Sequence, residues 1–391
     1  MKSKLADFDI QGKTVLLRID ANVPIDHGII LNDQRLVASL PTIHQLLDKG
    51  AHIILMTHMG RPQNEDPNFS TQQLISWFQD NGLDIAFAKN IDDAQNKKEN
   101  HRLILLENLR FFPGEKGRDP QFAQQLAQLG EFYINDAFGT FARKDTSVTL
   151  LPDQFEEHHK TIGLLVEHEL AMLDQIIKKN KKPFYLIIGG GKVADKIPLI
   201  AKLLPHISSL FLGPAIVFTF LKAMGKKVGN SLVDSNAINL CKDIIMQAEQ
   251  LGVTIEYPLD YIIAEGSFDG PFEITENNVI PDGDVGVSIG PKTAKQWSNQ
   301  LMKAETIVLN GLMGTVKRIE SLAYTKDIFH AMTQSHATTL IAGGDSVAAL
   351  YYFNLAKNID YLSTGGSATL QYLSGQNLPA LDALKNRTKT E

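Results

Sequence analysis

The stretch from Phe184 to Lys196 combines residue types that could bind phosphate. It reads Phe-Tyr-Leu-Ile-Ile-Gly-Gly-Gly-Lys-Val-Ala-Asp-Lys, so a short apolar run ends in glycines and a helical pattern opens at Val193. The first backbone amides of a helix have no partner inside the helix, so such a junction offers N–H donors to an anion. The spacing differs from both Gly-x4-Gly-Lys-Ser/Thr and Gly-x-Gly-x-x-Gly. The stretch therefore indicates either a nucleotide or sugar-phosphate site, or a tight turn followed by solvated lysines.

Arginines recur beside short apolar runs in the first half of the chain. They are Arg18, Arg35, Arg61, Arg110 and Arg143. Arginines at the ends of successive parallel strands converge in space, and the planar guanidinium group suits carboxylate and phosphate oxygens. Each of them could instead pair with a nearby acid, such as Arg18 with Asp20, or lie in solvent. Taken together they predict a small, strongly anionic ligand.

Other polar residues of these loops have both a binding and a structural interpretation. His58 lies beside Gly60, and is either a ligand-binding group or a hydrogen-bonded loop residue. Asp20 and Asn22 precede Pro24, where they could bind a ligand or form a turn.

Glycine replaces arginine in the corresponding loops of the second half. These loops are 286–291, 310–311, 343–346 and 365–366. Loops without side chains let backbone amides approach phosphates and a flat base, while Asp345 could hold a metal ion. Each glycine pair alone would suit an ordinary turn, and Asp345 would equally suit a helix N-cap. Around the glycine and lysine stretch they predict a nucleotide.

The elements that must position these residues alternate along the chain. Apolar runs at 15–19, 53–56, 103–106, 132–134, 184–188, 210–212, 307–309, 339–341 and 361–362 are each followed by a polar or glycine-rich loop and a helical pattern. This alternation predicts an α/β fold with parallel sheets flanked by helices, in which ligands gather at the carboxyl ends of the strands. A length of 391 residues predicts two domains. A helical pattern that ends in lysines and Pro183 is the predicted connector between them.

Composition limits the class of protein. The formal net charge of −6 gives no reason to expect a nucleic-acid partner. The single cysteine, Cys241, fits a reducing compartment. The longest apolar stretch, at 210–221, is interrupted by Gly213 and Pro214 and is too short to span a bilayer. We therefore expect a soluble cytoplasmic protein without a membrane partner.

An anion pocket in one half and phosphate-binding loops in the other predict phosphoryl transfer between two substrates. In such a reaction positioned cations and helix N-termini stabilise the moving group, and the protein does little covalent chemistry. Water must be excluded, which predicts that the domains close.

From about residue 14 to 383 the chain resembles the phosphoglycerate kinase family. The resemblance is carried by Arg18-Ile-Asp-Ala-Asn-Val-Pro24, His58-Met-Gly-Arg-Pro62, Leu106-Glu-Asn-Leu-Arg110, Asn135-Asp-Ala-Phe-Gly-Thr140, Gly190-Gly-Lys-Val-Ala-Asp-Lys196, Asn310-Gly311 and Gly343-Gly-Asp-Ser346. It implies a monomer that reversibly transfers a phosphoryl group from 1,3-bisphosphoglycerate to Mg-ADP, giving 3-phosphoglycerate and ATP.

The resemblance also implies an arrangement of domains. These are two Rossmann-like domains with a cleft between them: a glycerate-binding domain at 1–168 and a nucleotide-binding domain at 169–375. They are joined by a connector helix at about 167–180, and the segment 376–391 returns to the N-terminal domain.

Site residues follow from the same resemblance. The implied glycerate site comprises Asp20, Ala21, Asn22, Arg35, His58, Met59, Gly60, Arg61, Arg110 and Arg143. The implied nucleotide site comprises Gly190, Gly191, Lys192, Lys196, Gly213, Gly286, Asn310, Lys317, Gly343, Gly344, Asp345 and Ser346. Arg35, Lys192 and Lys196 would act on the transferring group, and Asp345 would bind Mg²⁺.

The chain departs from the family pattern mainly on the nucleotide side. Lys317 replaces a glutamate that reaches the ribose hydroxyls, and Glu320 is the nearest carboxylate that could take its place. Further departures are Pro214, Ala215, Ser288, Leu312 and Ser367, with Ala142 and Asp145 on the glycerate side. These departures keep open a second function, a related binding or regulatory protein with an impaired nucleotide site. A dinucleotide-dependent oxidoreductase is disfavoured by the missing Gly-x-Gly-x-x-Gly.

Overall fold

The computed structural model describes residues 5–179, 181–191 and 193–385 of the chain. The chain divides into two compact units. Unit 1 comprises residues 1–171 and 377–391, and unit 2 comprises residues 172–376. The division falls within the helix α7 (Leu164–Lys179). That helix buries Val166 and Leu173, whereas Ile177 is 45% exposed.

Unit 1 is built on a six-stranded parallel sheet with the order β5-β6-β4-β1-β7-β8. The strands are β1 (Thr14–Arg18), β4 (His52–Met56), β5 (Ala86–Ala88), β6 (Leu103–Leu106), β7 (Phe132–Asn135) and β8 (Lys160–Ile162). From β1 the chain proceeds toward one edge and then returns to β7 on the other side of β1, so the topological switch point lies between β1 and β7. Ligands of open α/β sheets bind at this point.

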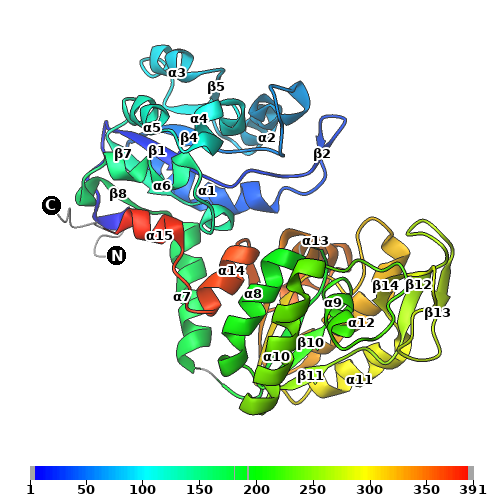
Figure 1. Cartoon of the computed structure of the whole chain (residues 1–391). Coiled ribbons are helices and arrows are strands. Elements are labelled where there is room, and N and C mark those ends of the chain that lie inside the picture. Colours follow the sequence, from blue (N-terminus) through cyan, green and yellow to red (C-terminus); the bar gives the residue numbers. More distant parts are fainter. Residues whose placement is uncertain (1–4, 180, 192, 386–391) are drawn as a thin grey trace. The chain divides into compact units, whose positions relative to one another are not determined.

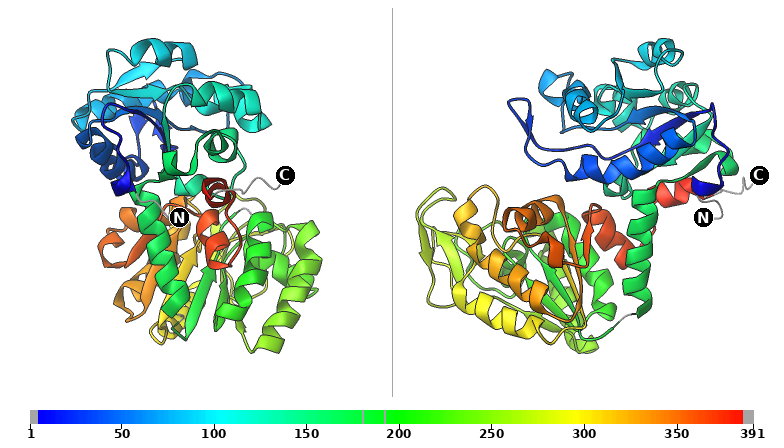
Figure 2. Two further views of the ribbon diagram at one scale, coloured as in Figure 1. Left: turned by 90° about the vertical axis from the view of Figure 1, so that its left-hand side faces the viewer. Right: turned by 180° about the vertical axis from the view of Figure 1, so that it is seen from behind.

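Helices cover both faces of this sheet (Figures 1 and 2). They are α1 (Gln34–Asp48), α2 (Ile75–Asp80), α3 (Ile91–Lys97), α4 (Pro113–Gly117), α5 (Pro120–Ala127), α6 (Thr146–Thr149), the start of α7 and α15 (Pro379–Leu384). Alternate residues of β1 supply separate cores, with Val15 and Leu17 in one and Leu16 in the other. The short antiparallel strands β2 (Ile25–Asp26) and β3 (Ile29–Ile30) form a hairpin. Its turn holds His27 and Gly28 at positive φ.

Unit 2 repeats the plan with the order β11-β10-β9-β15-β16-β17, again all parallel. The strands are β9 (Phe184–Ile188), β10 (Ser209–Leu212), β11 (Thr254–Glu256), β15 (Thr306–Asn310), β16 (Thr338–Ala342) and β17 (Tyr361–Ser363). The helices are α8 (Val193–Leu203), α9 (Ile216–Ala223), α10 (Ile238–Leu251), α11 (Pro291–Leu301), α12 (Ala323–Gln334), α13 (Gly344–Tyr352) and α14 (Ser367–Leu373). The switch point lies between β9 and β15.

The α/β fold predicted from the apolar runs is confirmed, because every predicted run lies in a strand of one of the two parallel sheets. An additional antiparallel sheet in unit 2 was not predicted. It has the order β13-β12-β14, with β12 (Tyr261–Ala264), β13 (Phe272–Ile274) and β14 (Val285–Ile289). Gly286, expected in a loop, therefore lies within the strand β14.

Short 3₁₀ helices complete both units. They are η1 (Leu5–Asp7), η2 (Pro67–Phe69), η3 (Thr71–Leu74), η4 (Leu109–Phe111), η5 (Phe138–Thr140), η6 (Pro152–Gln154) and η7 (Glu157–His159) in unit 1, and η8 (Leu204–His206), η9 (Ser235–Ala237), η10 (Ile319–Leu322) and η11 (Ala356–Asn358) in unit 2. Within the described ranges, no helix is both long and apolar enough to cross a membrane.

Candidate active site

His58 is the centre of a buried cationic cluster in unit 1. It follows β4, and its side chain is 1% exposed. The Arg18 Nη2 atom lies 3.2 Å from Nδ1 of the ring, and the Arg143 Nη1 atom lies 2.8 Å from Nε2. Burial, followed by the positive charges of Arg18 and Arg143, lowers the pKa of His58 well below its usual value. The ring is therefore neutral at pH 7.

Asp20 and Asn22, which follow β1, bind their neighbours through their polar atoms. Arg35 Nη1 donates to both carboxylate oxygens of Asp20, at 3.1 and 3.0 Å, and to the Asn22 carbonyl at 3.2 Å. The Asn22 Oδ1 atom accepts from the Gly60 amide at 2.8 Å. The partner of Asp20 is thus Arg35 and not Arg18, which lies two residues before Asp20 in the sequence and had suggested a pair. Ala21 between them is fully buried.

The loop after β6 holds Arg110 against the loop after β4. Asn108 Oδ1 accepts from the amides of Met59 and Arg110, at 3.1 and 3.0 Å, and Arg110 Nη1 donates to the Gly60 carbonyl. Gly60 has φ +58°, and a Cβ there would lie 2.2 Å from the ring of Phe69. Sequence reasoning did not assign a role to Asn108, although its place directly after a strand was a signal for one.

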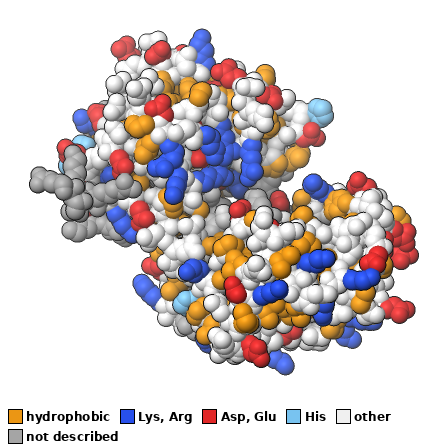
Figure 3. Space-filling model, in the orientation of Figure 1, with side chains coloured by type: hydrophobic (Ala, Val, Ile, Leu, Met, Phe, Trp, Pro, Cys, Tyr) orange, Lys and Arg blue, Asp and Glu red, His pale blue; other side chains and the backbone are white. Residues whose placement is uncertain are grey.

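The arginines around this loop act electrostatically on His58 or on one another. Burial and then Arg143 lower the pKa of Arg110 to about 10, with further lowering from Arg18 and Arg61. Arg61 is exposed and makes no hydrogen bond or ion pair within the described residues. Figure 3 shows Lys and Arg side chains gathered on one face of unit 1. Like charges this close favour a bound anion, because an anion removes their mutual repulsion.

In unit 2, Lys196 lies at the topological switch point. Its Nζ atom donates to the carbonyl oxygens of Gly189, at 2.6 Å, and Asn310, at 3.3 Å. Gly189 directly follows β9, and Asn310 is the last residue of β15. Gly311 has φ +102°, and a Cβ there would lie 2.0 Å from the Gly189 oxygen. Only glycine therefore fits at 311 while the strand ends stay this close. Lys192 lies outside the described residues.

The start of α13 contributes the remaining predicted polar residues. The N-cap of α13 is Gly343, with φ +103°, so the alternative of Asp345 as N-cap is wrong. Ser346 Oγ accepts from the Gly311 amide at 3.1 Å. Asp345 lies exposed in the first helical turn, and its carboxylate has no hydrogen bond or ion pair within the described residues. This is a position where a carboxylate can meet a bound cation.

A single carboxylate is compatible with Mg²⁺ but not with a site made by protein ligands alone. In the part of the chain that the structure describes, no group of three His, Cys, Asp or Glu residues could hold a metal ion. Mg²⁺ usually keeps several waters and is bound by one or two carboxylates together with substrate phosphates. Asp345 fits that mode, with a nucleotide supplying the other ligands.

Two of the predicted glycines have a packing role. A Cβ at Gly213 would lie 2.6 Å from Sδ of Met313, and one at Gly286 would lie 2.3 Å from the ring of Phe218. The positions therefore exclude side chains whether or not a ligand contacts them.

Lys317 lies in the loop after β15, and Glu320 lies in the 3₁₀ helix η10 that follows it. Lys317 is exposed, and its amide donates to Thr315 Oγ1 at 3.3 Å. The Glu320 carboxylate accepts from Arg318 Nε at 3.1 Å and from its Nη2 at 3.0 Å. The same guanidinium lies 3.6 Å from the centre of the Phe272 ring. Glu320 thus has a cationic partner already.

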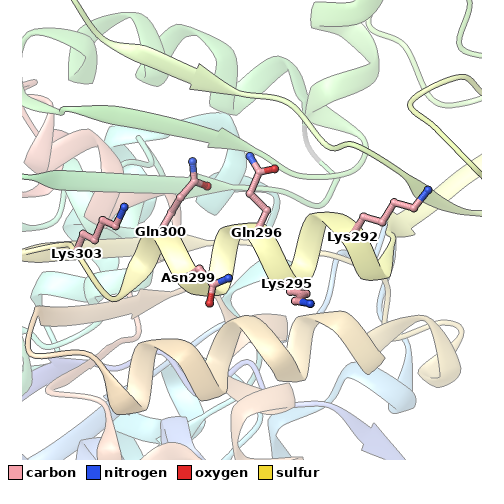
Figure 4. Close-up of a pocket in the computed structure, with 6 residues that line it drawn as sticks. All are labelled: Lys292, Lys295, Gln296, Asn299, Gln300 and Lys303. Carbon is pink, nitrogen blue, oxygen red and sulfur yellow. The ribbon is translucent and has the colours of Figure 1, made fainter.

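A groove runs along the outer side of α11 (Figure 4). It is lined by Lys292, Lys295, Gln296, Asn299, Gln300 and Lys303. None of these residues belongs to either predicted site, so the groove is separate from the residues discussed above.

Two doubly wound sheets, one with an arginine cluster and one with glycine-lined loops at its strand ends, are the architecture expected of an enzyme that transfers phosphate between two small substrates. Residues 5–376 match the family model described as phosphoglycerate kinase. A phosphoglycerate kinase from Bdellovibrio bacteriovorus is 38% identical over 394 residues, which cover 98% of this chain and 97% of that protein. One from Aquifex aeolicus is 38% identical, with 99% of each chain covered.

Solved structures agree with the sequence relatives. The phosphoglycerate kinase from Pyrococcus horikoshii OT3 has a TM-score of 0.84 at 27% identity, over 97% of this chain and 98% of that one. The enzyme from Coxiella burnetii has a TM-score of 0.78 at 28% identity, with the same coverage. The chain belongs to the phosphoglycerate kinase family. It is a kinase of glycolysis that transfers a phosphoryl group between 1,3-bisphosphoglycerate and ADP. No finding favours the alternative of a binding or regulatory protein.

Proposed function

We propose that unit 1 binds 3-phosphoglycerate and 1,3-bisphosphoglycerate, and that unit 2 binds ADP and ATP. The observation that carries this division is the arginine cluster around the neutral His58, at the carboxyl ends of β1 and β4. A glycerate phosphate is small and strongly anionic, so it complements several guanidinium groups at once. Unit 2 offers instead the glycine-lined ends of β9, β15 and β16, which suit a nucleotide.

Within unit 1, we assign Arg35 to the transferring phosphoryl group. Only its Nη1 atom makes hydrogen bonds to the described residues, to Asp20 and the Asn22 carbonyl. Its other N–H groups can therefore bind a ligand. A guanidinium stabilises the charge that develops on a phosphoryl group during its transfer. Asp20 and Asn22 then position Arg35 as well as contacting substrate.

Within unit 2, Lys196 brings positive charge to the ends of β9 and β15, and the first turn of α13 adds backbone amides. Lys192 shares the phosphate-binding role on the resemblance to the family. Asp345 would hold Mg²⁺ together with the nucleotide phosphates. When bound, the metal ion neutralises charge on the phosphates. We also propose a monomer that works in the cytoplasm, as the family resemblance and the single cysteine suggest.

A pair of binding measurements tests the division between the units. We expect Arg61→Ala to weaken 3-phosphoglycerate binding in calorimetry and to leave Mg-ADP binding unchanged. Asp345→Asn should weaken Mg-ADP binding and leave 3-phosphoglycerate binding unchanged. When Mg²⁺ is chelated, Asp345→Asn and wild type should bind ADP equally. Lys295→Ala, in the groove of α11, is the control for loss of a cation elsewhere. If Arg61→Ala weakened both ligands equally, or neither, the assignment of unit 1 would be wrong.

A further inference from the structure

A continuous chain of buried contacts leads from Glu115 to the ring of His58. Glu115 in α4 is fully buried and accepts from Ser147 Oγ at 2.6 Å and from the Ser147 amide at 2.8 Å. The Arg18 Nε atom donates to the same Ser147 Oγ at 3.0 Å, and its Nη2 atom reaches His58 Nδ1 at 3.2 Å. This series of contacts joins α4, α6, β1 and the loop after β4, so residues that are far apart in the sequence act on one imidazole.

The two arginine contacts of His58 cannot both be hydrogen bonds. A guanidinium only donates, and a neutral imidazole has one acceptor nitrogen and one N–H group. Arg18 faces Nδ1 and Arg143 faces Nε2. One ring nitrogen therefore accepts from its arginine, and the other presents an N–H to a second donor.

Burial decides which contact is the hydrogen bond. Arg18 is fully buried; its Nε atom donates to Ser147 Oγ and its Nη1 atom to the Ile19 carbonyl. A buried charged donor without an acceptor is costly, so the contact of Arg18 with Nδ1 must be kept. Arg143 is only partly buried and can turn to solvent or to an anion instead. The burial of Arg18 therefore favours the proton on Nε2, although the contact of Arg143 with Nε2 is the shorter of the two, at 2.8 against 3.2 Å.

Glu115 supplies the charge that makes this arrangement stable. A fully buried guanidinium needs a counter-ion, and Arg18 acts electrostatically on Glu115. Burial raises the pKa of Glu115, and the charge of Arg18 opposes that rise. Ser147 transmits the interaction because its hydroxyl group donates to Glu115 while it accepts from Arg18.

We propose that Glu115, Ser147 and Arg18 are positioning residues that hold His58 as the Nε2–H tautomer, so that the ring donates a hydrogen bond to the anionic substrate. In the free protein, the Nε2–H group opposes Arg143 donor to donor. An entering carboxylate or phosphate oxygen accepts from both groups and removes this conflict. Binding of an anion is therefore favoured for two reasons: the anion is attracted to the positive charges of the site, and it relieves the contact between the two donors. The inference rests on the proposed role of unit 1 in binding the glycerate substrate.

Nitrogen-15 NMR of the imidazole rings tests the proposal without any ligand. In uniformly ¹⁵N-histidine-labelled protein, His58 is assigned by comparison with His58→Gln. The expected wild-type spectrum shows a protonated Nε2 and an unprotonated Nδ1 for this ring. In Ser147→Ala, Arg18 Nε loses its acceptor, and the guanidinium is expected to turn toward the Glu115 carboxyl group and away from Nδ1. Nε2 can then accept from Arg143, and an Nδ1–H form should appear. Ser39→Ala is the matched control, since it removes another buried hydroxyl group of unit 1, which donates to Leu36.

Calorimetry with 3-phosphoglycerate completes the test. We expect binding about ten-fold weaker in Ser147→Ala, which corresponds to one hydrogen bond to a charged group, and unchanged in Ser39→Ala. Glu115→Gln should give the same tautomer change. A wild-type ring protonated on Nδ1, or a Ser147→Ala spectrum identical to wild type for His58, would overturn the proposal. Failure of the proposed function would look different, because wild-type protein would then not bind 3-phosphoglycerate at all.

Discussion

Replacing Arg35 with alanine should affect catalysis and stability by separate routes. The Arg35 side chain is 28% exposed, and it forms an ion pair of 3.0 Å with Asp20, whose side chain is 5% exposed. Its removal leaves a buried carboxylate without its partner, which costs about 2–3 kcal/mol at this partial exposure. That corresponds to a fall in Tm of roughly 4–12 °C for a unit of 150–250 residues.

The catalytic effect should be larger. A positioned donor that faces charge developing in the transition state is worth about 2.7–4 kcal/mol, or a factor of about 100 to 1,000 in kcat. We expect Arg35→Ala to lower kcat by at least this factor in a coupled assay of ATP formation, with little change in KM for 1,3-bisphosphoglycerate.

A double variant separates the two effects. Asp20→Asn removes the charge that Arg35→Ala leaves unpaired, so the double variant should recover most of the lost Tm. Its kcat should stay as low as that of Arg35→Ala, because the cation is still missing. If kcat remained near wild type and only KM rose, Arg35 would position substrate without acting on the transition state. If kcat recovered together with Tm, the loss would come from local unfolding.

Three further predictions concern other parts of the chain. Lys317→Glu should tighten Mg-ADP binding about ten-fold in calorimetry, since a carboxylate accepts hydrogen bonds from ribose hydroxyls and an ammonium group cannot; Glu320→Gln should change nothing, because Glu320 is already paired. Gly60→Ala should cost roughly 1–3 kcal/mol in urea unfolding, because its φ of +58° and the ring beside it exclude a Cβ. Burial raises the pKa of Asp136 to about 6, so its stabilising effect is present at low pH and lost as the pH rises through 6. Relative to Asp136→Asn, the free energy of unfolding of wild type should fall by about 2–3 kcal/mol between pH 4 and pH 7.

Each of these three predictions would be contradicted by a particular result. An effect of Glu320→Gln without one of Lys317→Glu would mean that Glu320 serves the ribose. A Gly60→Ala variant of wild-type stability would show that the loop after β4 can relax. A difference between wild type and Asp136→Asn that did not change with pH would mean that folding does not shift the pKa of Asp136 into this range.

The central strands of both sheets could be predicted from the sequence alone. Strands covered on both faces are continuous apolar runs, and β1 and β15 are buried along their whole length. Edge strands give a weaker signal, because they are short. Three of them, β5, β8 and β11, were missed; each has three residues, and β5 and β11 are also partly exposed. The antiparallel sheet was missed as well: its outer strand β13 is partly exposed, but its central strand β12 is a buried run of four residues that was not predicted either.

The sequence also determined which residue types gather at the strand ends, because parallel strands bring all their carboxyl ends to one edge. It could not determine how those residues pair. Arg18 is next but one to Asp20 in the sequence, yet Asp20 binds Arg35, and Arg18 is linked to Glu115 through Ser147. Pairing depends on distances across several loops and on which groups are shielded from water, and only the tertiary structure fixes both. The neutral state of His58 has the same origin, since it follows from burial among arginines that come from separate strand ends.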